Sequence, residues 1–458
     1  MEPAKLGDYN AACSRFDSRL FGGPRMLRLH NLRLLDHLRH RYTADDVARL
    51  TAFLRSEGTF RFEALPSGLY PAAQVDVDDP SGYAAVWIRD NVHVAHALLV
   101  DGDADAARRT IDGLTTFLFG QRRRFAALLA RELDPREPMN RPHIRFDGRS
   151  MNEIDVRWAH AQNDALGYYL WLSARMIDVG ASEPTPRLCE VLAAVALFLE
   201  LVDFPRDEDS GHWEETRKRG MSSVGAATAG LAELLHVVRR RDSADGLTFD
   251  GRRLTAERLA RLVSEGRSEL AATLPYECRD PDAAKRREAD AALLFLIYPL
   301  EIVDAPTADA ILQLVLRDLA GEIGIRRYRG DSYWCADYKR KLEAERRSAD
   351  FSDDLTERDA LLDEGQEAQW CIFDPIVSAA YGRRFAQSND PRHLELQMRY
   401  LNRSLAHLTP DDCRFGGLRC PESYYLENGC YVPVDQTPLL WTQANLLTAL
   451  RLLEANLR

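Results

Sequence analysis

The chain has 458 residues, of which 45% are hydrophobic and 29% charged, enough to build a full globular core. This composition excludes a disordered or fibrous protein. The 60 Lys and Arg against 71 Asp and Glu leave a formal charge of −11. Because nonspecific affinity for nucleic acid depends mainly on cationic side chains that neutralise phosphates, this acidic balance argues against a nucleic-acid partner.

Residues 1–10 carry charged side chains and lack the apolar stretch of a signal peptide. No later stretch approaches the roughly 18 uninterrupted apolar residues of a membrane-spanning helix. We therefore expect a cytoplasmic protein with no membrane partner.

Ligands for a metal or a nucleotide are not grouped in this sequence. The eight cysteines are scattered, with neither a Cys-x-x-Cys pair nor the spacing of a zinc site. His93 and His96 lie three residues apart on one predicted helix, but no third ligand accompanies them. Neither a P-loop nor a GxGxxG motif is present. The sequence thus predicts no metal and no cofactor.

Apolar residues recur at three- and four-residue spacing, which predicts about a dozen helices. In chain order these cover 45–56, 88–101, 104–132, 158–178, 187–203, 221–240, 253–271, 287–299, 307–320, 366–386, 391–408 and 435–457. Almost nothing alternates with period two, so few strands are expected.

Long and short connections roughly alternate between these helices. The long ones, rich in Gly, Pro and Asp, are 66–82, 133–157, 204–220, 275–286, 321–365 and 409–434. A closed ring of helical hairpins needs this alternation, because one rim keeps short turns while the other can carry a site. The sequence therefore predicts an all-α fold, an (α/α)6 barrel of six hairpins. A helical solenoid is the alternative, although no repeat of about 30–45 residues is visible.

The chain is expected to form a single barrel domain with one arm and one insertion. Residues 1–45 are predicted to be an N-terminal arm packed on a barrel that spans 46–458. Residues 346–363, RRSADFSDDLTERDALLD, are densely charged, which predicts a mobile surface insertion.

Six of the seven tryptophans lie at or beside predicted loop–helix junctions, each within a few residues of a carboxylate or an amide. They are Trp87, Trp158, Trp213, Trp334, Trp370 and Trp441, whereas Trp171 is mid-helix. If the junctions share one rim, that rim suits a sugar, because indoles stack on C–H faces while polar groups bind hydroxyls. A role in the core is the alternative for any one tryptophan.

Two of the long loops carry glutamates beside aromatic residues. Glu214 and Glu215 follow Trp213, and Glu422 lies between a proline and two tyrosines. Hydrolysis of a glycoside by direct displacement needs a protonated carboxyl and an ionised one about 6.5–9.5 Å apart, so that a water fits between. Desolvation beside indoles raises a carboxyl pKa toward the general-acid range. A surface or helix-capping role is the alternative for each glutamate taken alone.

Several short motifs resemble, in order and spacing, those of the glucoamylase-like glycoside hydrolases (family fifteen). They are Trp87-Ile88-Arg89-Asp90, Gln162-Asn163-Asp164, Trp213-Glu214-Glu215, Arg327-Tyr328-Arg329-Gly330-Asp331, Pro421-Glu422-Ser423-Tyr424 and the closing stretch 438–446. Others are similar to the α subunit of phosphorylase kinase, a relative of that family: Trp158-Ala159-His160-Ala161-Gln162-Asn163-Asp164-Ala165, Ser222-Ser223-Val224-Gly225 and Glu367-Ala368-Gln369-Trp370. The resemblance runs from about residue 80 to residue 457.

The resemblance implies an (α/α)6 barrel, in agreement with the helix count, and roles for individual residues. Glu214 matches the family's general acid and Glu422 its general base. Arg89 and Asp90 resemble the pair that grips the nonreducing-end glucosyl unit, and Arg327 resembles an arginine that holds sugar hydroxyls. The further residues expected to bind substrate at the same rim are Trp87, Gln162, Asp164, Trp213, Glu215, Asp331 and Trp370.

We therefore expect an inverting, exo-acting α-glucoside hydrolase that releases a terminal glucosyl unit from a small soluble α-glucan or disaccharide. The alternative is a non-catalytic carbohydrate-binding or regulatory protein related to the kinase subunit. One stretch, Thr216-Arg217-Lys218-Arg219, departs from the family pattern because it is strongly basic. Cations beside Glu214 are expected either to lower its pKa or to bind an anionic group, such as a phosphate, on the substrate.

Overall fold

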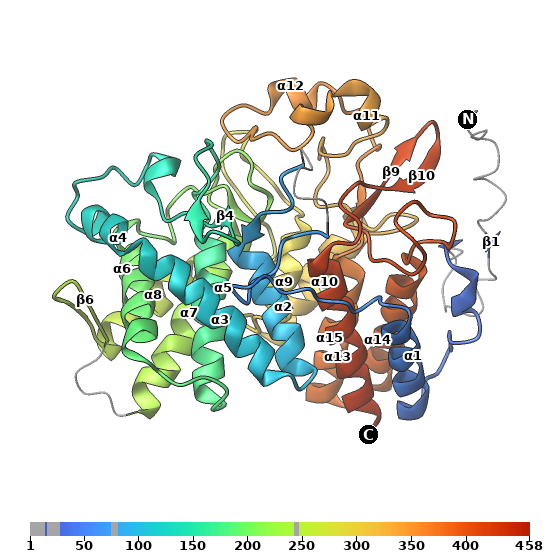
Figure 1. Ribbon diagram of the computed structural model, residues 1–458, viewed down its shortest axis with the longest axis horizontal. Helices are drawn as coiled ribbons and strands as arrows, with labels where there is room; N and C mark the ends of the chain where they lie inside the picture. The colour runs from blue at the N-terminus through green and yellow to red at the C-terminus, as the bar shows by residue number, and fades with distance from the viewer. Residues whose placement is uncertain (1–13, 16–27, 75–80, 242–246) are drawn as a thin grey trace.

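The structure is a computed structural model that describes residues 14–15, 28–74, 81–241 and 247–458. These residues are mostly helical, as the sequence predicts (Figure 1). Most of the predicted N-terminal arm falls in 1–13 and 16–27, which lie outside the described residues.

Each of the predicted helical segments contains at least one helix. The helices are α1 (Ala44–Ser56), α2 (Ile88–Val100), α3 (Ala104–Gly120), α4 (Arg122–Leu129), α5 (Asn163–Asp178), α6 (Pro186–Leu201), α7 (Met221–Arg240), α8 (Ala256–Thr273), α9 (Leu294–Ile297), α10 (Ala305–Asp318), α11 (Tyr338–Lys341), α12 (Thr356–Asp359), α13 (Phe373–Ser388), α14 (Pro391–Ala406) and α15 (Leu440–Leu457). The short α11 and α12 were not predicted, since they lie in the long 321–365 connection.

Two predicted helices differ from the observed ones for local reasons. The segment 104–132 is divided at Gln121, whose side-chain amide donates to the carbonyl of His143 (3.1 Å) and accepts from its N–H (2.8 Å). The segment 287–299 is shortened to a 3-10 helix, Ala291–Leu293, followed by the four residues of α9, whose C-cap is Tyr298. Tyr298 has extended backbone, as expected for a residue before a proline, here Pro299.

Short antiparallel strands pair within the connections between the helices. They are β1 (Ser14–Arg15), β2 (Arg28–Leu29), β3 (Val86–Trp87), β4 (Arg145–Asp147), β5 (Asn152–Glu153), β6 (Leu247–Phe249), β7 (Arg252–Leu254), β8 (Gln369–Trp370), β9 (Ser423–Glu427) and β10 (Cys430–Pro433). In the sheet β8-β9-β10, Trp370 pairs with Ser423. This pairing places Trp370 beside the loop that carries Glu422.

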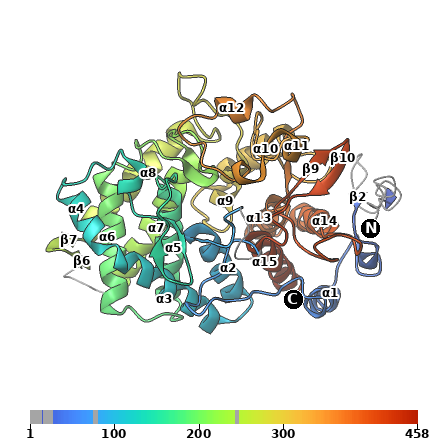
Figure 2. The same ribbon diagram turned by 45° about the horizontal axis from the view of Figure 1, so that its top comes forward.

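Six helices contact one another in a closed sequence: α2 packs on α5, α5 on α7, α7 on α9, α9 on α13, α13 on α15, and α15 on α2. Figure 2 shows α9 between α7 and α13. Each of the six also packs on a further helix: α3 on α2, α6 on α5, α8 on α7, α10 on α9, α14 on α13 and α1 on α15. All but the last of these pairs are successive in the chain, and the last joins its two ends.

The helix α7 illustrates how deeply the inner helices are buried. It is long and apolar enough to span a membrane, but 83% of its apolar stretch is buried inside the protein. Contacts with α5, α8 and α9 account for this burial. A helix surrounded on several sides needs an apolar surface all round, so the composition of α7 fits a core helix.

The contact between α5 and α7 is made backbone to backbone. A Cβ on Gly167 would lie 2.5 Å from the carbonyl carbon of Ala226, and a Cβ on Gly230 would lie 2.4 Å from the oxygen of Gly167. Both distances are far shorter than van der Waals contact. Glycine at these two positions is therefore what allows the helices to approach.

Gly230→Ala is expected to lower the free energy of unfolding by about 1–3 kcal/mol, because the added methyl group must push α5 and α7 apart. The better helix propensity of alanine, about 1 kcal/mol, offsets only part of this loss. Gly120→Ala is the matched control, since a Cβ at the end of α3 meets no atom within 4 Å. Urea unfolding measures both variants, and equal stability of the two would contradict the close approach.

Candidate active site

One pocket contains most of the residues that the sequence predicts to bind sugar. Its wall includes Trp87, Arg89, Asp90, Trp213, Glu214, Arg327, Trp370 and Glu422. These residues come from the first turn of α2 and from the loops before α2, α7, α11, α13 and α15. The other four predicted residues, Gln162, Asp164, Glu215 and Asp331, are buried outside this lining.

Arg89, in the first turn of α2, is a buried cation of the pocket wall, only 3% exposed. Its Nη1 donates to Asp164 Oδ2 at 2.7 Å and to Gln162 Oε1 at 3.0 Å. A buried guanidinium is tolerated only when carboxylate and carbonyl partners replace its water. Asp164 and Gln162, from the start of α5, therefore hold Arg89 in place from behind.

Glu214 has a left-handed backbone conformation, with φ 58° and ψ 41°. Such a conformation costs a residue other than glycine about 1–3 kcal/mol and concentrates at functional sites. Its Oε1 accepts hydrogen bonds from Trp87 Nε1 at 2.7 Å and from Gln162 Nε2 at 3.0 Å. Arg89 Nη2 lies 3.6 Å from the same oxygen. The unusual turn thus aims the carboxylate at a fixed set of donors.

Burial raises the pKa of Glu214, and the nearby groups oppose this rise. The charge of Arg89 acts first among them, followed by the hydrogen bond from Gln162. A raised pKa is the property that a general acid requires at neutral pH.

Glu422 is held by its backbone at the start of β9. Its N–H donates to the carbonyl of Gln436 (3.1 Å), and its carbonyl accepts from the N–H of Cys371 (2.9 Å). The Tyr83 hydroxyl donates to its Oε1 at 2.8 Å, while Oε2 is buried and has no hydrogen-bond partner in the part of the chain that the structure describes. Burial raises the pKa of Glu422 to about 8, and the hydrogen bond from Tyr83 lowers it.

The two glutamates therefore differ in how well their surroundings accept a negative charge. Among the described residues, Glu214 faces two hydrogen-bond donors and a guanidinium, whereas the Glu422 side chain accepts from one hydroxyl. A third carboxyl of the pocket, Asp90, has its pKa raised to about 7 by burial. Burial thus favours the protonated form of Glu422.

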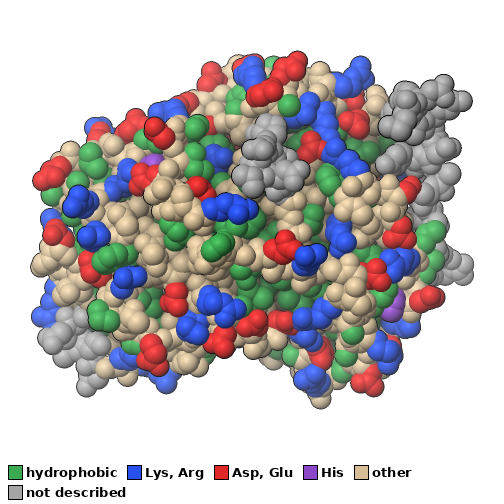
Figure 3. All heavy atoms as spheres, viewed as in Figure 1, with side chains coloured by type: hydrophobic (Ala, Val, Ile, Leu, Met, Phe, Trp, Pro, Cys, Tyr) green, Lys and Arg blue, Asp and Glu red, His purple; other side chains and the backbone are tan. Residues whose placement is uncertain are grey.

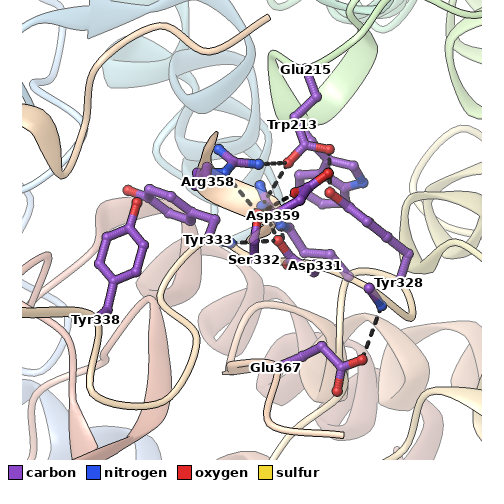
Figure 4. Close-up of polar contacts among 12 residues, drawn as sticks. Trp213, Glu215, Tyr328, Asp331, Ser332, Tyr333, Tyr338, Arg358, Asp359 and Glu367 are labelled. Carbon is purple, nitrogen blue, oxygen red and sulfur yellow. Dashed lines mark hydrogen bonds and ion pairs between the residues drawn. The ribbon is translucent and has the colours of Figure 1, made fainter. Parts of the chain in front are cut away.

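Glu215 points away from the pocket, contrary to the expectation that it lies in the pocket wall. Its Oε1 accepts from Arg327 Nη2 (3.1 Å) and Arg358 Nη2 (2.6 Å), and Oε2 accepts from the Tyr328 hydroxyl (2.5 Å) (Figure 4). Burial raises the pKa of Glu215, but the surrounding cations, Arg327 first, outweigh burial and hold the pKa well below its ordinary value. Glu215 is thus an ionised anchor for arginines.

Asp331 completes the support of Arg327. Its two oxygens accept from Arg327 Nε and Nη2, both at 2.6 Å, in a bidentate pair. The guanidinium carbon of Arg327 lies 5.2 Å from the Trp213 ring centroid and 4.7 Å from that of Trp370. A cation is thus fixed between two indoles of the pocket wall.

The basic run 217–219 does not line the pocket. Arg217 donates to the carbonyl of Arg136 (2.7 Å), Arg219 pairs with Glu269 (3.4 Å), and Lys218 is buried. The cations that act on Glu214 are Arg89 and Arg145. The expected effect of this run on the pKa of Glu214 is therefore not seen.

Five of the six tryptophans predicted at the rim line the pocket: Trp87, Trp158, Trp213, Trp370 and Trp441. Trp334 is instead packed against Tyr338 and Tyr425. Clustering at loop–helix junctions was therefore a sound signal for the site, even though it included one residue of the core.

Sequence reasoning did not single out Tyr83, Tyr333, Arg358 or the stretch 348–351, all of which line the pocket. Tyr83 lies four residues before Trp87, so the aromatic spacing ahead of the Trp-Ile-Arg-Asp motif was an available signal. Arg358 had no such signal, because it lies within the densely charged stretch 346–363.

Among the described residues, no group of three or more His, Cys, Asp and Glu side chains could hold a metal ion. On the face shown in Figure 3, acidic and basic side chains are interspersed.

Comparison with known proteins identifies the family. A model of the glycosyl hydrolases family 15 matches residues 49–345. The chain belongs to glycosyl hydrolase family 15. The Escherichia coli K12 protein described as an uncharacterized lipoprotein, YgeQ, is 30% identical over 207 residues, which cover 40% of this chain and 78% of that protein. A probable phosphorylase b kinase regulatory subunit alpha from Caenorhabditis elegans is 26% identical over 270 residues, 54% of this chain but 21% of the subunit.

Solved structures share the fold of this family 15 protein. A glycosidase in complex with glucose matches with a TM-score of 0.65 and 19% identity, covering 91% of this chain and 100% of the other. The glucoamylase of Saccharomycopsis fibuligera matches with a TM-score of 0.57 and 13% identity, covering 89% and 96%. The predicted relationship to glucoamylases, and distantly to the kinase subunit, is confirmed.

Glu422→Gln is expected to stabilise the folded protein at pH 8 by a few kcal/mol relative to wild type. The pKa of Glu422 is about 8 in the folded protein, above its value in the unfolded chain. The folded protein therefore loses stability as the pH rises between these two values, by about 1.4 kcal/mol per pKa unit. Glutamine carries no charge, so the gain should shrink toward pH 4.5, the ordinary pKa of the carboxyl. Urea unfolding at both pH values measures it, with exposed Glu183→Gln as control. A gain independent of pH would contradict the raised pKa.

Proposed function

We propose that this protein is an inverting, exo-acting α-glucoside hydrolase that releases a terminal glucosyl unit from a small soluble α-glucan or disaccharide. The observation that carries the proposal is that two carboxyls with raised pKa, the partly buried Glu214 and the buried Glu422, face one pocket walled by indoles and arginines. Family 15 membership and a structural neighbour that binds glucose support a carbohydrate ligand.

We further infer that the helices form the predicted (α/α)6 barrel. The support is the closed sequence of contacts α2-α5-α7-α9-α13-α15, each with a second helix packed on it. The pocket then lies at the end of the inner ring where α2, α13 and α15 begin.

In the proposed reaction, Glu214 protonates the glycosidic oxygen and Glu422 takes a proton from the attacking water. Arg89 and Asp90 bind hydroxyls of the terminal glucosyl unit, and Arg327 binds them from the opposite part of the wall. The sugar rings stack on the indoles. Exo action follows from a pocket that encloses one end of the substrate.

In the free protein, burial favours a proton on the other member of this pair, because it raises the pKa of Glu422 to about 8. Glu214, which has more donors, is the better-stabilised anion. In the active form, the two carboxyls together carry one proton. When the glycosidic oxygen binds beside Glu214, this proton moves to Glu214. The raised pKa of Glu422 also favours the reverse assignment, in which Glu422 is the acid and Glu214 the base.

The alternative function is a carbohydrate-binding or regulatory protein without catalysis, as the similarity to the kinase subunit suggests. Glucose release from maltose, trehalose, isomaltose, sucrose and maltotriose separates the two functions. Binding without release of glucose from any of them favours the regulatory protein.

Glu214→Gln and Glu422→Gln are each expected to lower kcat about 10²–10⁴-fold on a substrate that wild type hydrolyses, since each removes an acid or base group. Both variants should keep the wild-type circular dichroism spectrum. Glu183→Gln, a change on the surface, should retain full activity. A kcat near wild type in either pocket variant would remove that residue from the mechanism.

α-Glucosyl fluoride assigns the two roles, because fluoride departs with little help from an acid. Under the proposed assignment, Glu214→Gln should hydrolyse it at a rate within about tenfold of wild type, while Glu422→Gln should not, because water still needs a base. Azide, which needs no deprotonation, should restore turnover in Glu422→Gln and give β-glucosyl azide. If azide instead restores Glu214→Gln, the roles are reversed.

Tyr83→Phe is expected to move the basic limb of the profile of kcat/KM against pH to higher pH. This profile reports the pKa values of the free enzyme, and the hydrogen bond from Tyr83 favours ionised Glu422. Removing the donor raises the pKa of Glu422. The basic limb near pH 8, where the pair of carboxyls loses its one proton, therefore moves to higher pH. Tyr431→Phe, outside the pocket, is the control. A downward shift would contradict the assigned limb.

A further inference from the structure

The predicted insertion, 346–363, forms part of the pocket wall. It supplies Ser348, Ala349, Asp350, Phe351 and Arg358 to the same pocket as Glu214 and Glu422. Figure 1 shows α11, which precedes this stretch, and α12, which lies within it, above the ends of the central helices. The segment therefore lies at the end of the helices that carries the pocket.

One end of this segment is tied into the core by Arg358. The side chain is 5% exposed and donates from Nη2 to Glu215 Oε1 (2.6 Å) and from Nε to Ser332 Oγ (3.0 Å). Ser332 Oγ in turn donates to Asp359 Oδ1 at 2.5 Å. Figure 4 shows Arg358 reaching Glu215, with Ser332 and Asp359 beside them. Two successive residues of α12 are thus fixed to the core.

A second tie reaches the opposite part of the wall. Arg157 donates from Nε to Asp353 Oδ2 at 2.9 Å, and its Nη2 lies 2.7 Å from the same oxygen. Arg157 directly precedes Trp158, an indole of the pocket. This ion pair is exposed, with 52% and 66% of the two side chains accessible to solvent, so by itself it contributes little to holding the segment in place. The buried Arg358 pair is the firm attachment.

Arg358 also packs between residues 348–351 and the core. Its guanidinium carbon lies 5.7 Å from the ring centroids of both Phe351 and Tyr333, and both rings line the pocket. Arg358 shares the neutralisation of Glu215 with Arg327, which also pairs with Asp331. Of these two arginines, only Arg358 belongs to 346–363, so its particular contribution is the position of 348–351.

We propose that Arg358 determines substrate length: it fixes residues 348–351 across the outer part of the pocket, so that the unit beyond the terminal glucosyl is accommodated and a long glucan chain is excluded. This inference rests on the proposed function. In this inference Arg358 is a positioning residue, which acts through the wall that its hydrogen bonds to Glu215 and Ser332 hold in place.

The test compares binding of a disaccharide and a heptasaccharide of the malto and isomalto series, measured by tryptophan fluorescence in the Glu214→Gln background. In the presence of Arg358, the disaccharide should bind at least about tenfold more tightly than the heptasaccharide. Arg358→Ala should reduce that preference to about twofold or less by improving heptasaccharide binding. The ratio of kcat/KM values for the two lengths, measured without the Glu214 change, should move in parallel.

Two further variants make the result specific to the buried attachment. Arg358→Lys keeps the charge but cannot donate to Glu215 and Ser332 in a fork, so it should give an intermediate ratio and serves if Arg358→Ala fails to fold. Glu357→Ala removes an exposed ion pair with Arg346 in the same segment and should leave the ratio unchanged. Trypsin should cut 346–363 faster in Arg358→Ala than in Glu357→Ala.

The outcomes separate this inference from the proposed function. Faster cleavage of 346–363 with an unchanged length preference overturns the inference, as does equal binding of both lengths when Arg358 is present. A length preference that depends on Arg358, without glucose release by wild type, overturns the hydrolase function and leaves the inference standing. If the protein binds no sugar and releases no glucose, both the inference and the proposed function are overturned.

Discussion

The need to pair buried arginines shapes the rest of the site. Arg89 and Arg327 are 3% and 4% exposed, and a guanidinium removed from water is tolerated only with carboxylates around it. Asp164 at the start of α5 serves Arg89 of α2, while Asp331 and Glu215 serve Arg327. These ion pairs connect elements that are remote in sequence, so the pocket wall and the packing of the helices are held by the same contacts.

The carboxyl groups around the pocket also differ in pKa. Glu215 receives Arg327 and Arg358, has a low pKa and lies outside the pocket lining. Three carboxyls of the lining, Glu214, Asp90 and Glu422, have a pKa raised by burial. In the proposed reaction, raised pKa values suit groups that exchange protons near neutral pH.

Much of this arrangement could be predicted from the sequence, and the remainder depends on contacts that a local pattern does not encode. The helical segments were predictable because their apolar spacing is strong, and the motif order located the pocket. Glu214 and Glu215 show where such reasoning ends. They are adjacent, but the left-handed backbone at Glu214 directs one into the pocket and the other toward Arg327 and Arg358. Arg358 looked like one more charge of a solvated stretch, since only the folded chain brings it to Glu215.

Two departures of this chain from ordinary folding preferences lie in its pocket. Glu214 is a non-glycine residue with φ 58°, and Glu422 has a buried oxygen that no described residue hydrogen-bonds. Each departure costs stability, so the surrounding structure must hold it in place. β8 pairs with β9 directly beside Glu422, and the donors Trp87 and Gln162 lie at the starts of α2 and α5. A rigid frame of helix starts and short strands is therefore what allows two destabilised carboxyls to face one small volume.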